Sequence, residues 1–458
     1  MTSELFQKYS VPGPRYTSYP TVPYWSESPT ESQWIQKIYE GLQENDRLGV
    51  GAAIYIHIPF CESLCTYCGC NTRITRNHSV AAPYLSSVVR EWEIYRELLE
   101  KTGSPEKLKV GELHLGGGTP TFLSPDELSF LVDGILKKVQ LISGFEFSVE
   151  VDPRVTTSDH LSVLHRLGFR RISLGVQDFD PVVQAAVHRV QSFERVRKLT
   201  DSAREMGYES VNFDLIYGLP FQTLKSIEAT MRSVLELRPD RIAYYSYAHV
   251  PWIKPAQRRF TEEDLPKKDE KRALYELGRS LLEEAGYSEV GMDHFSLRTD
   301  SLWTAVQKGT LHRNFMGYTS KNVSPLIGLG VSAIGDAWGA FAQNEKLVEQ
   351  YQKRVEKGEL PIFRGHLLNQ EDLILRKHIL NIMTRGETSW SAEELEIECL
   401  RNIGLRLQEL SKDGLVELSQ NQCRVPPLGR PFIRNICMAF DARLFRNAPK
   451  TELFSQTV

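Results

Sequence analysis

The feature that most constrains the fold is a theme repeated between residues 50 and 250. A short apolar or β-branched run is followed each time by a longer amphipathic stretch. Six runs are predicted to be strands: Ala52–Ile58, Gly111–Leu115, Phe145–Val151, Arg171–Val176, Val211–Tyr217 and Arg241–Tyr247. Helical patterns lie between them, as in Tyr84–Glu100 and Pro125–Val139, and Ser124 with Glu127 predicts a capping box for the second.

Alternating strands and helices favour a parallel sheet with right-handed crossovers. Six such units predict an α/β fold built on an incomplete (β/α)6 parallel barrel, related to the eightfold one. A doubly wound open sheet is the structural alternative.

The chain of 458 residues exceeds the usual size of one domain. We expect an N-terminal arm and helix over residues 1–48, a main domain over 49–360 with its core units at 50–250, and a C-terminal domain over 361–458. The arm contains Gly13–Pro20 (GPRYTSYP), whose prolines and tyrosines indicate an extended segment. After Lys267 the pattern is mostly helical, apart from the apolar stretch Leu326–Ile334. The C-terminal domain is predicted to be mostly helical, with a small β-ribbon at Leu415–Leu418 and Gln422–Val425.

Charge and hydropathy exclude several functional classes. The formal net charge is −3, and basic residues are spread along the chain, so no electrostatic footprint for nucleic acid is present. The N-terminus has no basic segment followed by an apolar run, and no stretch of about 18 apolar residues occurs. We therefore expect a cytoplasmic protein that associates with neither nucleic acid nor membrane.

The seven cysteines are unevenly distributed. Four lie within ten residues, at 61, 65, 68 and 70, and the others are Cys399, Cys423 and Cys437, for which small buried side chains are the default expectation. A tight cluster in such a long chain favours a metal or cofactor site over disulfides.

The spacing C-x3-C-x2-C of Cys61, Cys65 and Cys68 can hold three irons of a cubane cluster and leave the fourth iron open. The alternative is a zinc site with Cys70 as a fourth thiolate. Zinc sites usually draw ligands from two separated knuckles, and no second knuckle is present, so the spacing favours iron and sulfur.

Further polar or glycine-rich positions follow the predicted strands. Leu115–Pro120 (LGGGTP) would let the backbone approach a bound molecule, but it matches neither a P-loop nor a dinucleotide fingerprint. Other strand ends carry Glu150, Gln177, Asp178, Asp214, Ala248 and His249. Because parallel barrels build their sites at the carboxyl ends of strands, these residues and the cysteine loop predict one shared site.

The cysteine loop Tyr55–Cys70 and the glycine run resemble the radical S-adenosylmethionine superfamily. The resemblance implies a radical SAM catalytic domain over 49–360 and a [4Fe–4S] cluster on Cys61, Cys65 and Cys68. In that superfamily S-adenosylmethionine binds the open iron, and its homolysis gives methionine and a 5′-deoxyadenosyl radical. Cys70 is then not a ligand.

Within this superfamily the chain is similar over nearly its whole length to the oxygen-independent coproporphyrinogen III oxidases. The similarity is carried by Gly13–Thr21, Tyr55–Asn71, Leu115–Thr121, Val149–Arg154, Gly175–Phe179, Asn212–Pro220, Gly291–Phe295, Leu311–Thr319, Gly330–Ile334 and Arg434–Asp441. It implies conversion of two propionates of coproporphyrinogen III to vinyl groups, giving protoporphyrinogen IX in haem biosynthesis, with an external electron donor and acceptor. A haem chaperone or haem-degrading paralogue is the alternative.

Carried over position by position, the resemblance implies two molecules of S-adenosylmethionine. The molecule on the cluster would contact Tyr55, Gly117, Glu150 and Ile334, of which Tyr55 and Glu150 are the catalytic candidates. The second would contact Tyr67, Gly118, Thr119, Gln177, Arg189, Asp214 and Ala248. Since guanidinium groups pair well with carboxylates, Arg15 and Arg313 are candidates for binding the propionates of the tetrapyrrole, with a structural role as the alternative. We expect a monomer.

Overall fold

The fold is built on one large sheet. The computed structural model describes residues 3–395, 398–449 and 454–457. Its twelve-stranded sheet has the order β16-β15-β14-β13-β1-β4-β5-β6-β7-β8-β10-β9. The strands predicted from the sequence are β1 (Ala52–Ile58), β4 (Leu108–Gly117), β5 (Val139–Val151), β6 (Arg171–Gln177), β7 (Ser210–Tyr217) and β8 (Arg241–Ser246). Each is parallel to the next.

The strand order distinguishes the two predicted architectures. A doubly wound sheet reverses its order at a switch point, whereas β1 and β4 to β8 lie side by side in chain order. The sheet ends at β16 and β9 and does not close on itself. The incomplete parallel barrel is therefore confirmed.

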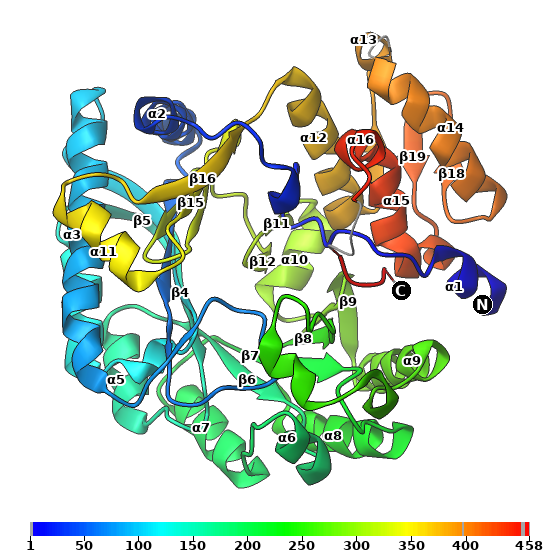
Figure 1. Ribbon diagram of the computed structural model, residues 1–458, viewed down its shortest axis with the longest axis horizontal. Coiled ribbons are helices and arrows are strands. Elements are labelled where there is room, and N and C mark those ends of the chain that lie inside the picture. The colour runs from blue at the N-terminus through cyan, green and yellow to red at the C-terminus, as the bar shows by residue number, and fades with distance from the viewer. Residues whose placement is uncertain (1–2, 396–397, 450–453, 458) are drawn as a thin grey trace.

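The connecting helices cover the outer side of the barrel (Figure 1). They are α3 (Ala81–Lys101), α4 (Pro125–Leu136), α5 (Ser158–Arg166), α6 (Pro181–Ala186), α7 (Phe193–Glu205) and α8 (Leu224–Leu237). In α4 the predicted capping box is present, since Ser124 Oγ accepts from Glu127 N and the Glu127 carboxylate accepts from Ser124 N. The helix predicted over Pro125–Val139 ends early, at Leu136, because Val139 begins β5 by pairing with Leu108 of β4.

The region after Lys267 is less helical than predicted. It contains α9 (Lys268–Glu284), α10 (Ser301–Lys308) and α11 (Val348–Glu356), but also strands that extend both edges of the barrel. These strands are β9 (Tyr287–Gly291), β10 (His294–Leu297), β13 (Leu326–Leu329), β14 (Ile334–Asp336), β15 (Ala340–Asn344) and β16 (Ile362–Leu367). A separate hairpin consists of β11 (His312–Asn314) and β12 (Gly317–Thr319). Short strands of this kind have no strong periodicity, and partner strands distant in sequence stabilise them.

The C-terminal part has its own hydrophobic core, which includes Leu375, Leu407, Leu415 and Phe432. Its helices are α12 (Gln370–Arg385), α13 (Ala392–Leu395), α14 (Glu398–Lys412), α15 (Ile433–Phe440) and α16 (Ala442–Arg446). The predicted ribbon is a small sheet of β17 (Glu387–Ser389), β19 (Gln422–Arg424) and β18 (Glu417–Leu418). The domain boundary at residue 361 stays a prediction.

Two cysteines of the C-terminal part, Cys423 and Cys437, are buried as expected. The side chain of Cys399 lies outside the described residues. No helix in the described ranges combines the length and the apolar character needed to cross a bilayer.

The N-terminal segment links the two cores. After α1 (Ser3–Tyr9), the residues from Gly13 to Pro20 form neither helix nor strand, and α2 (Glu31–Leu48) follows. Tyr16 and Tyr19 are only 4% and 2% exposed because they pack into the C-terminal core. Figure 1 shows this dark blue segment running past the C-terminal helices, as an extended arm would.

Candidate active site

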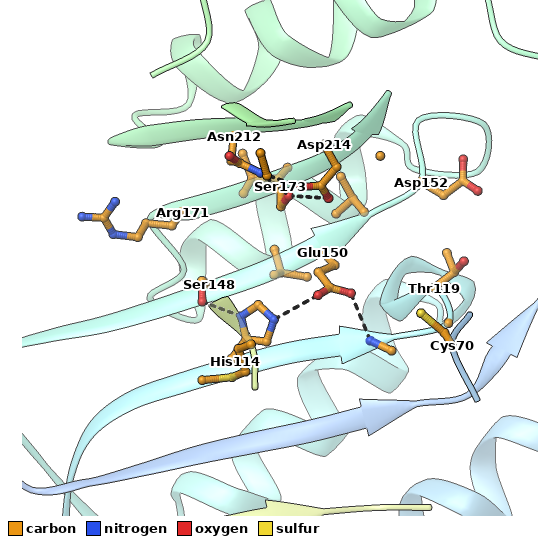
Figure 2. Close-up of a pocket in the computed structure, with 18 of the residues that line it drawn as sticks. Cys70, His114, Thr119, Ser148, Glu150, Asp152, Arg171, Ser173, Asn212 and Asp214 are labelled. Atoms are coloured by element: carbon orange, nitrogen blue, oxygen red, sulfur yellow. Dashed lines mark hydrogen bonds and ion pairs between the residues drawn. The ribbon is translucent and has the colours of Figure 1, made fainter. Parts of the chain in front are cut away.

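The interior of the barrel is a cavity of about 410 Å³. Ordinary parallel barrels are filled by branched apolar side chains. In this barrel the inward-facing positions of β5, β6 and β7 include Ser148, Ser173 and Asn212, which are small and polar (Figure 2). These side chains leave space where a barrel core would otherwise be packed.

Most of the predicted site residues line this one cavity. They are Cys61, Cys65, Tyr67, Cys68, Gly117, Gly118, Thr119, Glu150, Gln177, Arg189 and Asp214. They come from the cysteine loop, from the carboxyl-terminal parts of β4, β5, β6 and β7 and, for Arg189, from the segment between α6 and α7. The predicted shared site is therefore present at the carboxyl ends of the strands.

Seven predicted residues are not part of the cavity lining: Arg15, Tyr55, Asp178, Ala248, His249, Arg313 and Ile334. Tyr55 lies behind the lining, where its ring stacks on His114 with centroids 5.8 Å apart. Ile334 lies near Tyr55, since Gly328 pairs with Tyr55 and its α-carbon abuts the Ile334 backbone.

The cysteine loop carries basic and hydroxyl partners for its sulfur atoms. The buried Cys65 Sγ lies 3.4 Å from Arg154 Nη2 and 3.5 Å from Arg189 Nη1. Cys61 Sγ lies 3.3 Å from Thr119 Oγ1. Two guanidinium groups therefore lie within hydrogen-bonding distance of one sulfur of the loop.

The remaining two thiols of the loop interact with each other. A hydrogen bond from Cys70 lowers the pKa of Cys68 to about 6. Burial raises the pKa of the Cys61 thiol to about 11, which a bound metal would offset. Cys70 N also donates to Cys68 Sγ over 3.4 Å. Cys70 thus lies beside the predicted ligand set and contacts one of its members.

The loop fits an iron–sulfur cubane better than a single zinc ion. Among the residues that the structure describes, no three His, Cys, Asp or Glu side chains converge as a mononuclear site requires. In a cubane each thiolate binds a different iron, so three cysteines that line one cavity suit the cluster. The donor set, with Cys61, Cys65 and Cys68 on one loop facing one cavity, fits a [4Fe–4S] cluster.

Glu150, near the carboxyl end of β5, is held as a carboxylate that lines the cavity. Gly117 N donates to Glu150 Oε2 over 3.1 Å, and His114 Nε2 lies 3.4 Å from Oε1 (Figure 2). Burial alone would raise the pKa of Glu150, but His114 and the Gly117 amide hold it below its usual value. His114 Nδ1 in turn lies 2.7 Å from Ser148 Oγ, which fixes the ring. An ionised carboxylate in this place suits a cationic ligand.

A second acid, Asp214, faces the same cavity. Ser173 Oγ donates to it over 3.0 Å and Asn212 Nδ2 over 2.9 Å. Burial and the nearby Glu150 raise the pKa of Asp214 to about 6. Beside it, Gln177 has φ +68°, a strained conformation of the kind found at ligand sites.

Arg189 joins the strands to the cysteine loop. Its Nη1 donates to Asp152 Oδ2 over 3.1 Å and its Nη2 to the carbonyl of Gly175 over 2.6 Å. Arg154 Nη2 donates to the same Asp152 oxygen over 2.6 Å. The carboxylate therefore orients both arginines that contact Cys65.

The sequence analysis missed several lining residues, among them His114, Ser148, Ser173 and Asn212. Ser148 lies two positions before Glu150, Asn212 two before Asp214 and Ser173 four before Gln177. Because side chains alternate along a strand, the period of two could have identified these three residues.

An incomplete parallel barrel with three loop cysteines and an acid-lined interior defines a radical SAM enzyme. The family model for the radical SAM superfamily matches residues 55–234. Curated relatives include oxygen-independent coproporphyrinogen III oxidases of Pseudomonas aeruginosa, 38% identical over 96% of each chain, and of Escherichia coli, 38% identical over 99% of this chain and 98% of the relative.

The solved structure of coproporphyrinogen III oxidase (HemN) from Escherichia coli, described as a radical SAM enzyme, matches with a TM-score of 0.85. It is 38% identical, and the match covers 94% of this chain and 98% of that one. The chain belongs to the family of oxygen-independent coproporphyrinogen III oxidases. It is a radical SAM oxidoreductase that uses a [4Fe–4S] cluster and S-adenosylmethionine.

Proposed function

We propose that this protein converts two propionates of coproporphyrinogen III to vinyl groups and releases protoporphyrinogen IX and two carbon dioxides. The observation that carries this proposal is the cavity that Cys61, Cys65 and Cys68 line together with Glu150 and Asp214, in a chain similar over nearly its full length to named oxidases. That similarity includes the arm and the C-terminal part, which favours the oxidase over a haem-handling paralogue.

Cys61, Cys65 and Cys68 would hold the cluster. When bound, the cluster and S-adenosylmethionine supply the 5′-deoxyadenosyl radical that removes a hydrogen atom from the propionate β-carbon. Glu150 is placed to bind the ammonium group of the methionine moiety, since His114 and the Gly117 amide keep it ionised. Loss of carbon dioxide and of one electron then completes each vinyl group, with an external carrier as acceptor.

Two molecules of S-adenosylmethionine are part of the proposal. The first would contact Tyr55, Gly117, Glu150 and Ile334, and the second Tyr67, Gly118, Thr119, Gln177, Arg189, Asp214 and Ala248. Two separate acids in one cavity support this number, because each could meet one cationic ligand. Tyr55, Ala248 and Ile334 do not line the cavity, so their contacts are proposed from the similarity to the family alone.

The proposed partners are the tetrapyrrole, an electron donor and an electron acceptor. We further propose that the protein acts in the cytoplasm, as the charge pattern and the lack of apolar segments suggest, and that it is a monomer.

An anaerobic assay tests the function. Protein reconstituted with iron and sulfide would be incubated with coproporphyrinogen III, S-adenosylmethionine and a reductant. We expect protoporphyrinogen IX and 5′-deoxyadenosine to form together. Formation of 5′-deoxyadenosine with no change in the tetrapyrrole would contradict the proposed substrate.

Single cysteine variants test the ligand set. Cys61→Ala, Cys65→Ala and Cys68→Ala are each expected to lose the visible absorbance of the cluster and most of the bound iron. Cys70→Ala is the matched control on the same loop and should retain both. A Cys70→Ala protein without iron would show that Cys70 is a ligand.

A further inference from the structure

We propose that Arg313 anchors a carboxylate-binding subsite beneath the N-terminal arm, which holds one propionate of the substrate while another reaches the cavity. The inference rests on the proposed function for the identity of the substrate. Its starting point is a guanidinium group that pairs with no anion among the residues the structure describes. Arg313 is 8% exposed, yet within this part of the chain its Nε and Nη1 atoms have no hydrogen-bond partner.

Such an arrangement is costly unless a ligand completes it. A guanidinium remains charged at any physiological pH, and a buried charge needs a partner to offset its desolvation. Arg313 instead lies over the ring of Tyr318, 4.5 Å from its centroid, and Nη2 donates weakly to the Arg15 carbonyl over 3.5 Å. A carboxylate binds bidentately to two N–H groups on one edge of a guanidinium, and Nη2 forms such an edge with either of the unpaired nitrogen atoms of Arg313.

The surroundings of Arg313 carry an excess of positive charge. Burial, together with the charge of Arg15, lowers the pKa of Lys271 to about 8 and that of Arg434 to about 9, although Asp293 raises both. Within the described residues, no carboxylate oxygen lies within 4.0 Å of the charged nitrogens of Arg313, Lys271 or Arg434. An anionic ligand would relieve this repulsion.

Arg15 and Arg313, which the sequence treats alike, differ in the structure. Arg15 Nη1 pairs with Asp293 over 3.2 Å, and its Nη2 donates to the Ser246 carbonyl over 3.3 Å. A substrate carboxylate at Arg15 would have to displace Asp293. Arg313 needs no such exchange, so it is the direct partner and Arg15 a positioning residue.

The β11–β12 hairpin connects this subsite to the cavity. Arg313 pairs with Tyr318 across the hairpin, and Tyr318 lines the cavity. At the tip, the ring of Phe315 packs against Tyr55 with centroids 4.8 Å apart, and Met316 lines the cavity. One hairpin therefore reaches both the cavity and the open guanidinium, a span that suits a macrocycle with several propionate arms.

Binding measurements test the subsite without relying on turnover. The probes are coproporphyrin III, a stable oxidised form with the same four propionates, and its tetramethyl ester, which has no carboxylate. Full-length protein, reconstituted anaerobically, would be titrated with each by fluorescence. Wild type should prefer the acid. Arg313→Gln should bind the acid about 10-fold more weakly or worse, as for loss of a charged hydrogen bond, and the ester unchanged.

Arg376→Gln is the matched control. Arg376 is also buried and lies over an aromatic ring, that of Trp338, but it pairs with Asp336 and donates to the Trp338 carbonyl. Its loss should lower the melting temperature and leave porphyrin affinity unchanged. Arg313→Gln should not lower the melting temperature, because no ion pair is lost.

Two results would overturn the subsite: equal affinity of wild type and Arg313→Gln for the acid, or an equal loss for acid and ester, which indicates a packing effect. Arg313→Lys, which keeps the charge, should recover part of the preference for the acid and serves if the glutamine variant misfolds. If the wild type prefers the acid over the ester but forms no protoporphyrinogen IX, the result contradicts the proposed function but not the subsite.

Discussion

At the scale of single residues, the site depends on positions that must lack a side chain. Gly117 has φ +113°, and a Cβ there would lie 2.7 Å from the His57 ring. A Cβ at Gly118 would lie 2.7 Å from the Pro59 carbonyl oxygen, which precedes the cysteine loop. The glycine run thus lets two strands and the loop approach closely, while its amide binds Glu150.

Gly117→Ala is expected to weaken S-adenosylmethionine binding and to lower the free energy of unfolding by about 1–3 kcal/mol through strain. Isothermal titration of the cofactor and thermal melts would measure both. Gly404→Ala is the control, since Gly404 lies inside α14 and a Cβ there would meet no described atom within 4 Å apart from the adjoining residues and backbone of its own helix. It should stabilise the protein by about 0.5–1 kcal/mol.

The buried Glu112 should make the free energy of unfolding depend on pH. It faces the cavity, and burial raises its pKa from the ordinary 4.5 to about 8. Between about pH 5 and 8 the folded state keeps a proton that the unfolded state has lost, so this group makes stability fall as pH rises, by about 1.4 kcal/mol per pH unit.

Glu112→Gln has no such proton to lose. Its advantage over wild type in denaturant melts should therefore grow from pH 5 to pH 8 and then level off. The same change at the exposed Glu44 of α2 should show no comparable trend. A constant difference between Glu112→Gln and wild type across this range would refute the assignment.

At the scale of elements, the N-terminus of α4 is the helix end that the sequence predicts most directly. The capping box of α4 satisfies two backbone groups with Ser124 and Glu127. Ser124→Ala should lower the free energy of unfolding by about 1 kcal/mol in urea melts. Ser129→Ala, in the middle of the same helix, should have a smaller effect, and equal effects would argue against the cap.

At the scale of the whole molecule, Arg434 joins both ends of the chain to the C-terminal core. Its guanidinium donates to the carbonyls of Gly13 and Pro14 in the arm and of Gln456 near the C-terminus. Figure 1 shows the two ends of the chain close to each other beside α15. The arm then contacts the barrel through Arg15 and the C-terminal core through Tyr16 and Tyr19.

Arg434→Met should release the arm. We expect faster cleavage near residue 13 in limited proteolysis and a lower melting temperature, because buried carbonyls lose their donors. Arg424→Met, at a largely exposed side chain in β19, is the control and should leave the cleavage pattern unchanged. An unchanged pattern for Arg434→Met would show that apolar packing alone holds the arm.

Much of the fold and of the site was readable from local patterns. The six parallel strands, the α4 cap, the extended arm and the cysteine loop each depend on residues close together in sequence. His114 escaped notice because nothing local distinguishes it from a strand residue. Its proximity to Glu150 depends on the register between β4 and β5.

The sequence by itself determined the repeated βα units, the three cysteines and the glycine run, since periodicity and spacing are local properties of the chain. Only the tertiary structure decided which strands extend the edges of the barrel sheet. It also decided which of the two arginines has no carboxylate partner among the described residues. Arg15 and Arg313 are equivalent as sequence positions. Asp293, brought to Arg15 by the turn before β10, neutralises one and leaves the other open, because pairing between charges depends on distance in space.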